Sequence, residues 1–263
     1  MFGSTLAQMF SPEVRAYLTD RLVAAAEADT GITAAAVVGS AADHRQDRWS
    51  DIDLALRLAS AEQPVEVAES WTTQMYAEHQ AVDHLDVWSG DVLFRVFFLA
   101  DSLQVDLSFW PAKTFAATGP SFRLLFGDPG EPTLPPLPEP RGLIGWGWLY
   151  ALHARSAIAR RRPLQAVQML NGLRDQVISL ACLRHGVPAG QGRGVDDLPG
   201  DVTAAVAATL VAGGRPADLE GSLERLADLL IDEIKYIDRG LAGRLDAPIT
   251  ELVRSVLDRG PAQ

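Results

Sequence analysis

The sequence predicts an α/β domain with a mixed sheet, followed by an all-α helical bundle domain. In the first half, short apolar runs of strand length alternate with helical patterns, whereas in the second half apolar residues recur at helical spacing. A proline-rich stretch lies between the halves. The 263 residues suffice for two modest domains. We therefore expect one domain over residues 1–126, a linker over 127–142 and a bundle over 143–263.

The first half begins with a helix and continues mainly as strands. Ser11 suits the N-cap of a helix over residues 12–28, because Pro12 fits its first turn and Glu13 lies at its positive end. Residues 32–38 form an apolar run that ends at a glycine, as in a buried strand. The other predicted elements are a helix over 65–79 and strands over 51–58, 82–88, 92–99 and 103–110, the last two forming a hairpin. This order favours a mixed sheet.

The rest of the chain is divided by proline and glycine signals. Residues 127–142 contain six prolines, which neither a helix interior nor a central strand tolerates, so a linker is expected there. The clearest helix spans 163–185, because Pro163 suits its first turn and Gly186 its end. The other helices are expected over residues 143–160, 202–212, 218–239 and 247–258. Short loops between successive helices imply a bundle.

The motif that points to chemistry is Gly39-Ser40 followed, after ten residues, by Asp51-Ile52-Asp53. Gly39 ends a predicted strand and lets the backbone approach a ligand, while Ser40 and nearby N–H groups can hold phosphate oxygens. Asp51 and Asp53 are two residues apart, so their carboxylates share one face of a strand. Such carboxylates repel each other unless a cation lies between them, and Mg²⁺ prefers carboxylate and phosphate oxygens. The pattern indicates a metal that also holds a nucleoside triphosphate.

A third carboxylate is expected from one of two later strands. Asp106 lies in an apolar strand, where a charge without a partner is costly and a metal would supply that partner. Asp86 is the rival on an earlier strand, and we favour Asp106 because its apolar flanks are better. Taken alone, Asp51 and Asp53 would be better explained as the solvent-exposed side of an edge strand. Their spacing from Gly39 and the later Asp106 favour the metal site.

Gly39-Ser40, the spacing and Asp51-Ile52-Asp53 with its apolar flanks resemble the signature of the DNA polymerase β-like nucleotidyltransferase superfamily. Asp106 stands where that superfamily has its third acidic residue. The layout, a compact α/β domain before a helical bundle, is similar to that of the aminoglycoside and lincosamide nucleotidyltransferases. The matched segments cover roughly a quarter of the chain, and the helical half matches no motif.

The resemblance implies Mg²⁺-dependent transfer of NMP from a nucleoside triphosphate, with release of pyrophosphate. The expected donor is ATP or another NTP, since the sequence does not reveal which base is read, and the expected acceptor is a hydroxyl of a small molecule. Asp51, Asp53 and Asp106 would be catalytic and would bind metal, Asp106 holding a second ion or acting as the base. Gly39 and Ser40 would contact the triphosphate.

Two arginines and a group of aromatic residues are weaker candidates. Arg45 and Arg48 lie between the halves of the motif, where either could contact a phosphate or belong to a solvated loop. Trp146, Trp148 and Tyr150 follow the linker on one helix, which makes them core residues or residues of a ligand cleft.

Composition and charge narrow the location and the partners. The net charge is −11, and residues 1–140 carry 20 acidic and 8 basic side chains, which disfavours a nucleic-acid partner and suits a cationic, aminoglycoside-like acceptor. Cys182 is the only cysteine, and neither a membrane span nor a signal peptide is recognisable. A cytoplasmic protein without an internal disulfide is expected.

Two other functions fit parts of the sequence. A nucleotidyltransferase of the toxin–antitoxin type would keep the chemistry and modify a protein or a tRNA, with the three arginines of residues 160–162 as its basic patch. A degenerate binding module would keep only the fold, and the three intact aspartates of the motif argue against it.

Overall fold

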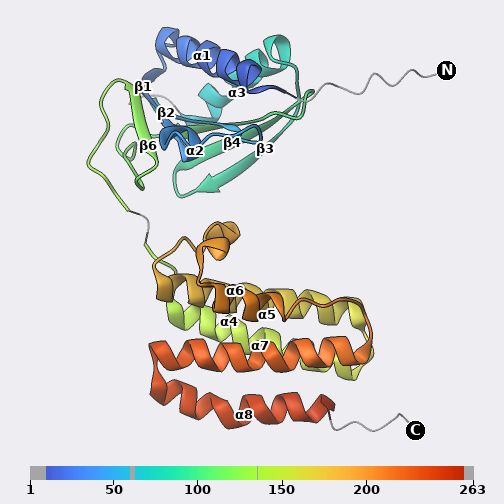
Figure 1. Cartoon of the computed structure of the whole chain (residues 1–263). Coiled ribbons are helices and arrows are strands. Elements are labelled where there is room, and N and C mark those ends of the chain that lie inside the picture. Colours follow the sequence, from blue (N-terminus) through green and yellow to red (C-terminus); the bar gives the residue numbers. More distant parts are fainter. Residues whose placement is uncertain (1–9, 60–62, 135, 258–263) are drawn as a thin grey trace, which may run out of the picture. The chain divides into compact units, whose positions relative to one another are not determined.

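The computed structural model describes residues 10–59, 63–134 and 136–257 of the chain (Figure 1). The chain divides into two compact units, Met1–Pro135 and Pro136–Gln263, and the division falls within residues 127–142. The first unit contains a mixed sheet with helices, and the second is helical. The predicted fold class, an α/β domain with a mixed sheet before an all-α bundle, is confirmed.

A six-stranded sheet forms the centre of the first unit, with strand order β3-β4-β5-β2-β1-β6. Strands β2 and β5 are parallel, and the other neighbouring pairs are antiparallel. Parallel neighbours require a crossover between them, which here contains α3 and the β3–β4 hairpin. The strands are β1 (Ile32–Val38), β2 (Ile52–Leu58), β3 (Ala81–Ser89), β4 (Val92–Leu99), β5 (Gln104–Trp110) and β6 (Phe122–Phe126).

Two helices, α1 (Pro12–Ala28) and α3 (Pro64–Glu78), pack on one face of the sheet (Figure 1). The hydroxyl of Ser11 accepts a hydrogen bond from the N–H of Val14 at 3.3 Å, which is the predicted N-cap. The core between helices and sheet includes Leu22 of α1 and Trp71 of α3, both buried against strand residues such as Phe109. Burial of these apolar side chains fixes which face of each strand is inward.

The opposite face of the sheet has its own, smaller apolar cluster. Phe115, from the segment after β5, packs on Ala34, Ala36 and Ala55 of β1 and β2. The alanines leave room for the ring close to the sheet. Helix α2 (Gly39–Ala42) is a single short turn directly after β1, and its Ala41 packs on the larger core on the helix side of the sheet. Neither α2 nor β6 was predicted from the sequence.

A buried arginine fastens α3 to the β3–β4 hairpin. Arg95 of β4 is 2% exposed, and its guanidinium donates to both carboxylate oxygens of Asp86 at 2.6 and 2.7 Å. It also donates to Glu69 at 3.0 Å and to the hydroxyl of Thr72 at 2.7 Å, both on α3. A buried charge is tolerated when several partners satisfy it in this way.

The second unit is a bundle whose core gathers the apolar stripes of its long helices. The helix over residues 163–185 has the predicted bounds, and Gly186 ends it with φ +69°, a left-handed conformation that favours glycine. The α-helices are α4 (Pro140–Ala159), α5 (Pro163–His185), α6 (Gly200–Ala207), α7 (Pro216–Ile237) and α8 (Arg239–Leu257). Two short 3₁₀ turns, η1 (Gly190–Gly192) and η2 (Val195–Asp197), precede α6. None of the helices within the described ranges has the length and apolar composition needed to cross a membrane.

Several helix bounds differ from those predicted. The last helix begins at Arg239 and not at residue 247, because Asp238 caps it by accepting a hydrogen bond from the N–H of Leu241 at 2.8 Å. Pro248, expected near its start, lies inside it on an exposed side, where water can satisfy the carbonyl that loses its partner. Helix α6 ends at Ala207 and not at residue 212.

The end of the proline-rich segment is also helical. Helix α4 begins at Pro140, three residues before the expected start of the bundle. The carboxylate of Glu139 accepts hydrogen bonds from the N–H groups of Arg141 and Gly142 at 2.9 and 2.7 Å. A proline in the first helical turn costs nothing, since its missing N–H would have no partner in the helix.

Candidate functional site

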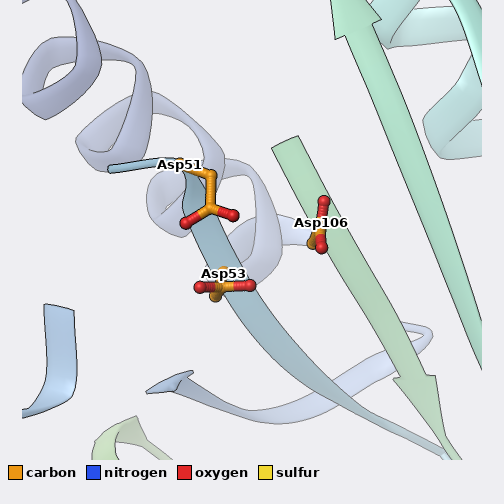
Figure 2. A group of neighbouring side chains, drawn as sticks. All are labelled: Asp51, Asp53 and Asp106. Atoms are coloured by element: carbon orange, nitrogen blue, oxygen red, sulfur yellow. The ribbon is translucent and has the colours of Figure 1, made fainter. Parts of the chain in front are cut away.

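The parallel pairing of β2 and β5 brings three predicted carboxylates together. Asp53 is in register with Asp106 on the neighbouring strand, and Asp51 directly precedes β2. Each of the three half-buried residues offers a carboxylate oxygen, and these atoms lie within 4.8 Å of one another. Figure 2 shows the side chains gathered over the two strands. The structure thus assembles from residues far apart in sequence the cluster that the motif predicted.

An amide side chain connects two of these carboxylates. Gln104 lies at the start of β5, and its Nε2 donates to Oδ1 of Asp106 at 2.9 Å and to Oδ2 of Asp51 at 3.4 Å. Gln104 and Asp106 are two residues apart on one strand, so they share a face. The amide therefore supplies N–H groups to a cluster that is otherwise rich in acceptors, and it limits how far the two carboxylates can separate.

The backbone at Gly39 lies directly against the third carboxylate. Gly39 has φ +63° at the junction between β1 and α2, a conformation that other residues rarely adopt. A Cβ atom at this position would be 2.6 Å from Oδ2 of Asp53, so the carboxylate would have to move away from it. Ser40 follows in the same turn. The backbone conformation therefore favours glycine at this position, and any other residue would displace the Asp53 carboxylate.

The loop before Asp51 is fixed by a buried arginine of α1. Arg15 is 6% exposed, and its Nη1 donates to the carbonyl oxygens of Asp47 and Ser50 at 2.6 and 2.9 Å. Asp47 in turn accepts from the N–H of Trp49, and this bond, together with the hydroxyl of Ser50, lowers the pKa of the Asp47 carboxyl. These bonds set the entry of the chain into β2, and with it the position of Asp51.

Asp86, the rival third carboxylate, lies on the opposite face of the sheet. It forms the bidentate ion pair with Arg95 on the α3 side, and the hydrogen bonds from Arg95 lower the pKa of its carboxyl. Its charge is therefore satisfied by the protein itself. The preference for Asp106 over Asp86 agrees with this placement.

The two loop arginines make other contacts. The guanidinium of Arg48 stacks over the ring of Trp49, 4.4 Å from its centroid. Arg45 pairs with Asp43 at 2.7 Å, and Asp43 also accepts a hydrogen bond from Ser121. Hydrogen bonds from Ser121 and then Arg45 lower the pKa of Asp43. Contact of Arg48 with a phosphate stays a prediction.

A comparison with solved structures found a similar protein. The chain is similar to the crystal structure of an aminoglycoside 6-adenyltransferase from Bacillus subtilis. The alignment has a TM-score of 0.43 and 14% sequence identity, and it covers 91% of this chain and 97% of the other. No known protein family and no curated protein matches the sequence.

Two features near the carboxylates were missed in the sequence. Gln104 could have been found, because strand alternation places it on the same face as Asp106. Arg123 could not, because it belongs to the unpredicted strand β6. Together with Arg15, Gln46 and Asp53, Arg123 lines a cavity of about 300 Å³ between α1, α2 and β6.

Proposed function

We propose that this protein is a nucleotidyltransferase that transfers AMP from ATP to a hydroxyl of a small-molecule acceptor, with Mg²⁺ held by Asp51, Asp53 and Asp106. The observation that carries the proposal is the cluster of three carboxylate oxygens within 4.8 Å, directly beside the turn at Gly39. Three carboxylates this close repel each other, and a cation bound between them would relieve that repulsion.

The donor set fits Mg²⁺. This ion binds oxygen ligands at about 2.1 Å, so ligands on opposite sides of it are about 4.2 Å apart. The carboxylate oxygens span at most 4.8 Å, which small side-chain rotations bring into that range. When bound, Mg²⁺ would neutralise charge on the triphosphate and on the leaving pyrophosphate.

The remaining chemistry falls to groups of the chain. The acceptor oxygen attacks the α-phosphorus, the bond from that phosphorus to the bridging oxygen breaks, and pyrophosphate leaves. The proton of the acceptor hydroxyl passes to a base, and Asp106 is the carboxylate available on the neighbouring strand. The turn at Gly39 and Ser40 lies directly beside Asp53, so its backbone N–H groups and the Ser40 hydroxyl are the groups that would bind the phosphates.

The charge of the chain supports a small, cationic acceptor. A net charge of −11 attracts amines and repels the phosphates of a nucleic acid. Aminoglycoside-like compounds, which combine hydroxyl groups with amines, are therefore the first acceptors to test.

The test is pyrophosphate release from ATP and Mg²⁺ by the full chain, with and without a panel of aminoglycosides and lincosamides. Release should depend on one compound and should disappear in Asp53→Asn. Asp91→Asn is the matched control, because Asp91 is exposed in the β3–β4 turn and pairs only loosely with Lys113 at 3.4 Å. That variant should retain release.

Nucleotide binding separates the possible failures. Binding of ATP and Mg²⁺ without release in the presence of any compound would move the proposal to a protein or tRNA acceptor. Absence of Mg²⁺-dependent nucleotide binding, measured by calorimetry with the non-hydrolysable analogue AMPCPP, would refute the proposal.

A further inference from the structure

Apolar side chains predominate on the face of β3 and β4 that lies on the same side of the sheet as the acidic cluster, with Asp83 opposite Phe98 as a charged neighbour. Leu85, Val87 and Phe98 are 63%, 46% and 53% exposed, which is unusual for large apolar side chains on a sheet face. Phe94 and Val96 are half-buried beside them. We call this set the apolar strip, and it consists of Leu85 and Val87 of β3 with Phe94, Val96 and Phe98 of β4.

The strand register places the apolar strip directly beside the acidic cluster. Val96 is opposite Asp106 and Phe98 is opposite Gln104 in the β4–β5 pair, and opposite residues share a face. Adjacent strands are about 4.8 Å apart, so the strip begins one strand away from Asp106. Gln104, which donates to Asp106, lies between the strip and the carboxylates. The strip is therefore continuous with the proposed site.

In the proposed reaction, the nucleoside triphosphate and the acceptor must approach the acidic cluster from opposite sides. In an in-line displacement, the attacking and leaving oxygens lie on opposite sides of the α-phosphorus. The turn at Gly39, which binds the phosphates, adjoins Asp53 from the β1 side. In the strand order β4-β5-β2-β1, the other side of the cluster is Asp106 followed by the apolar strip. The acceptor hydroxyl must therefore approach over β5 and β4.

We propose that the apolar strip binds an apolar face of the acceptor and thereby determines specificity. The inference rests on the proposed function and narrows its substrate class to compounds that carry an alkyl or aryl group next to the reacting hydroxyl. A fully polar polycation would leave Phe98 and Leu85 in water, whereas an apolar group placed on them removes that surface from water. Phe98 and Leu85 are positioned to select the acceptor and take no part in the chemistry.

A pair of probes with the same sugar hydroxyls tests this. Phenyl β-D-glucoside and methyl β-D-glucoside differ only in the apolar group. Each is added to the full chain with AMPCPP and Mn²⁺, which replaces Mg²⁺ and broadens the proton resonances of nearby molecules. The ring protons of the phenyl glucoside should broaden strongly, and the methyl glucoside should show at most a tenth of the effect.

Two variants and a control locate the effect. Phe98→Ser should reduce the broadening of the phenyl glucoside about tenfold, and Leu85→Ser, on the neighbouring strand, should reduce it severalfold. Leu124→Ser on the far strand β6, where the side chain is 36% exposed, should leave it unchanged. Equal broadening of both glucosides, or unchanged broadening in both strip variants, would overturn the inference.

Two further measurements show whether a negative result contradicts the proposed metal site or the role of the apolar strip. If Mn²⁺ does not bind, the proposed metal site fails, and saturation transfer from protein to the phenyl glucoside still tests the strip without metal. If the strip variants change the sedimentation of the protein, and the glucosides show no difference, the strip is a contact between two copies of the chain and the inference is wrong.

Discussion

Replacement of Gly39 by alanine adds one methyl group, which should affect both the stability of the first unit and the position of the Asp53 carboxylate. The first is backbone strain, since a non-glycine residue in the left-handed region costs about 1–2 kcal/mol. The second is the contact of the new Cβ with Oδ2 of Asp53, 2.6 Å away where ordinary contacts begin at 3.4 Å. The carboxylate must therefore retreat by about 0.8 Å, the difference between these distances. Misplacement of a reacting group by about 1 Å can cost roughly 100-fold in rate.

The two effects predict different readouts. In Gly39→Ala, thermal unfolding of the first unit should shift down by roughly 2–8 °C, as expected for 1–2 kcal/mol in a domain of this size. Pyrophosphate release should fall about 100-fold, because the metal-binding carboxylate is displaced. The affinity for Mn²⁺, measured by calorimetry, should fall with it.

Gly90→Ala is the matched control. Gly90, in the β3–β4 turn, has φ +59°, close to the φ of +63° at Gly39, but a Cβ there meets nothing within 4 Å. This variant should lose similar stability and keep its metal affinity and its activity. If both alanine variants lower activity equally, or if Gly39→Ala binds Mn²⁺ as the natural protein does, the assignment of Gly39 to the site is refuted.

Three other predictions concern buried polar groups. Arg95→Leu should destabilise the first unit by about 2–4 kcal/mol in urea denaturation. Arg95 lowers the pKa of Asp86 in the folded protein. The stabilisation from this ion pair is therefore fully present above the unfolded pKa of Asp86, about 3.9, and is lost as pH falls through the folded pKa. The Arg95→Leu variant lacks this contribution, so it should lose less stability on acidification than the natural protein. Arg174→Met removes the hydrogen bonds to Thr209 and should destabilise the bundle by about 1–3 kcal/mol without changing Mn²⁺ affinity. Burial raises the pKa of the Cys182 thiol, so it should react with a disulfide reagent at neutral pH only as the bundle unfolds.

Each of these predictions has an outcome that contradicts it. An unchanged acid dependence in Arg95→Leu would show that the ion pair with Asp86 is not the source of the pKa shift. Loss of Mn²⁺ affinity in Arg174→Met would show that the bundle contributes to the metal site. Fast reaction of Cys182 at neutral pH, before any unfolding, would show that the thiol is accessible.

Local signals in the sequence predicted most elements because they act over a few residues. Ser11 with Pro12, and Pro163 with Gly186, marked helix ends that the structure has at the same residues. The last helix begins earlier than the predicted residue 247, although a proline such as Pro248 usually starts or ends a helix. Here the helix continues through it, since Asp238 had already capped its start.

The strand pairs could not be predicted in this way. The sequences of β2 and β5 do not by themselves indicate that the two strands are parallel neighbours, because that pairing depends on contacts between residues far apart in sequence. Asp86 and Asp106 both stand in alternating strands, and the face of each was set by tertiary partners. Asp86 pairs with Arg95 on the α3 side of the sheet, whereas Asp106 lies beside Asp53 on the other side. The motif could therefore single out residues that lie together in the structure without indicating the sheet that joins them.

The parallel pairing of β2 and β5 also has a consequence for the order of folding. Asp53 and Asp106 are neighbours only after the intervening helix and hairpin have formed, so the ends of a long chain segment must meet before the carboxylates do. All three aspartates belong to the first unit. A chain that folds from its N-terminus during synthesis would thus complete the proposed metal site late within the first unit, and before the bundle is complete. Metal binding would then report on the closure of the sheet in a growing chain.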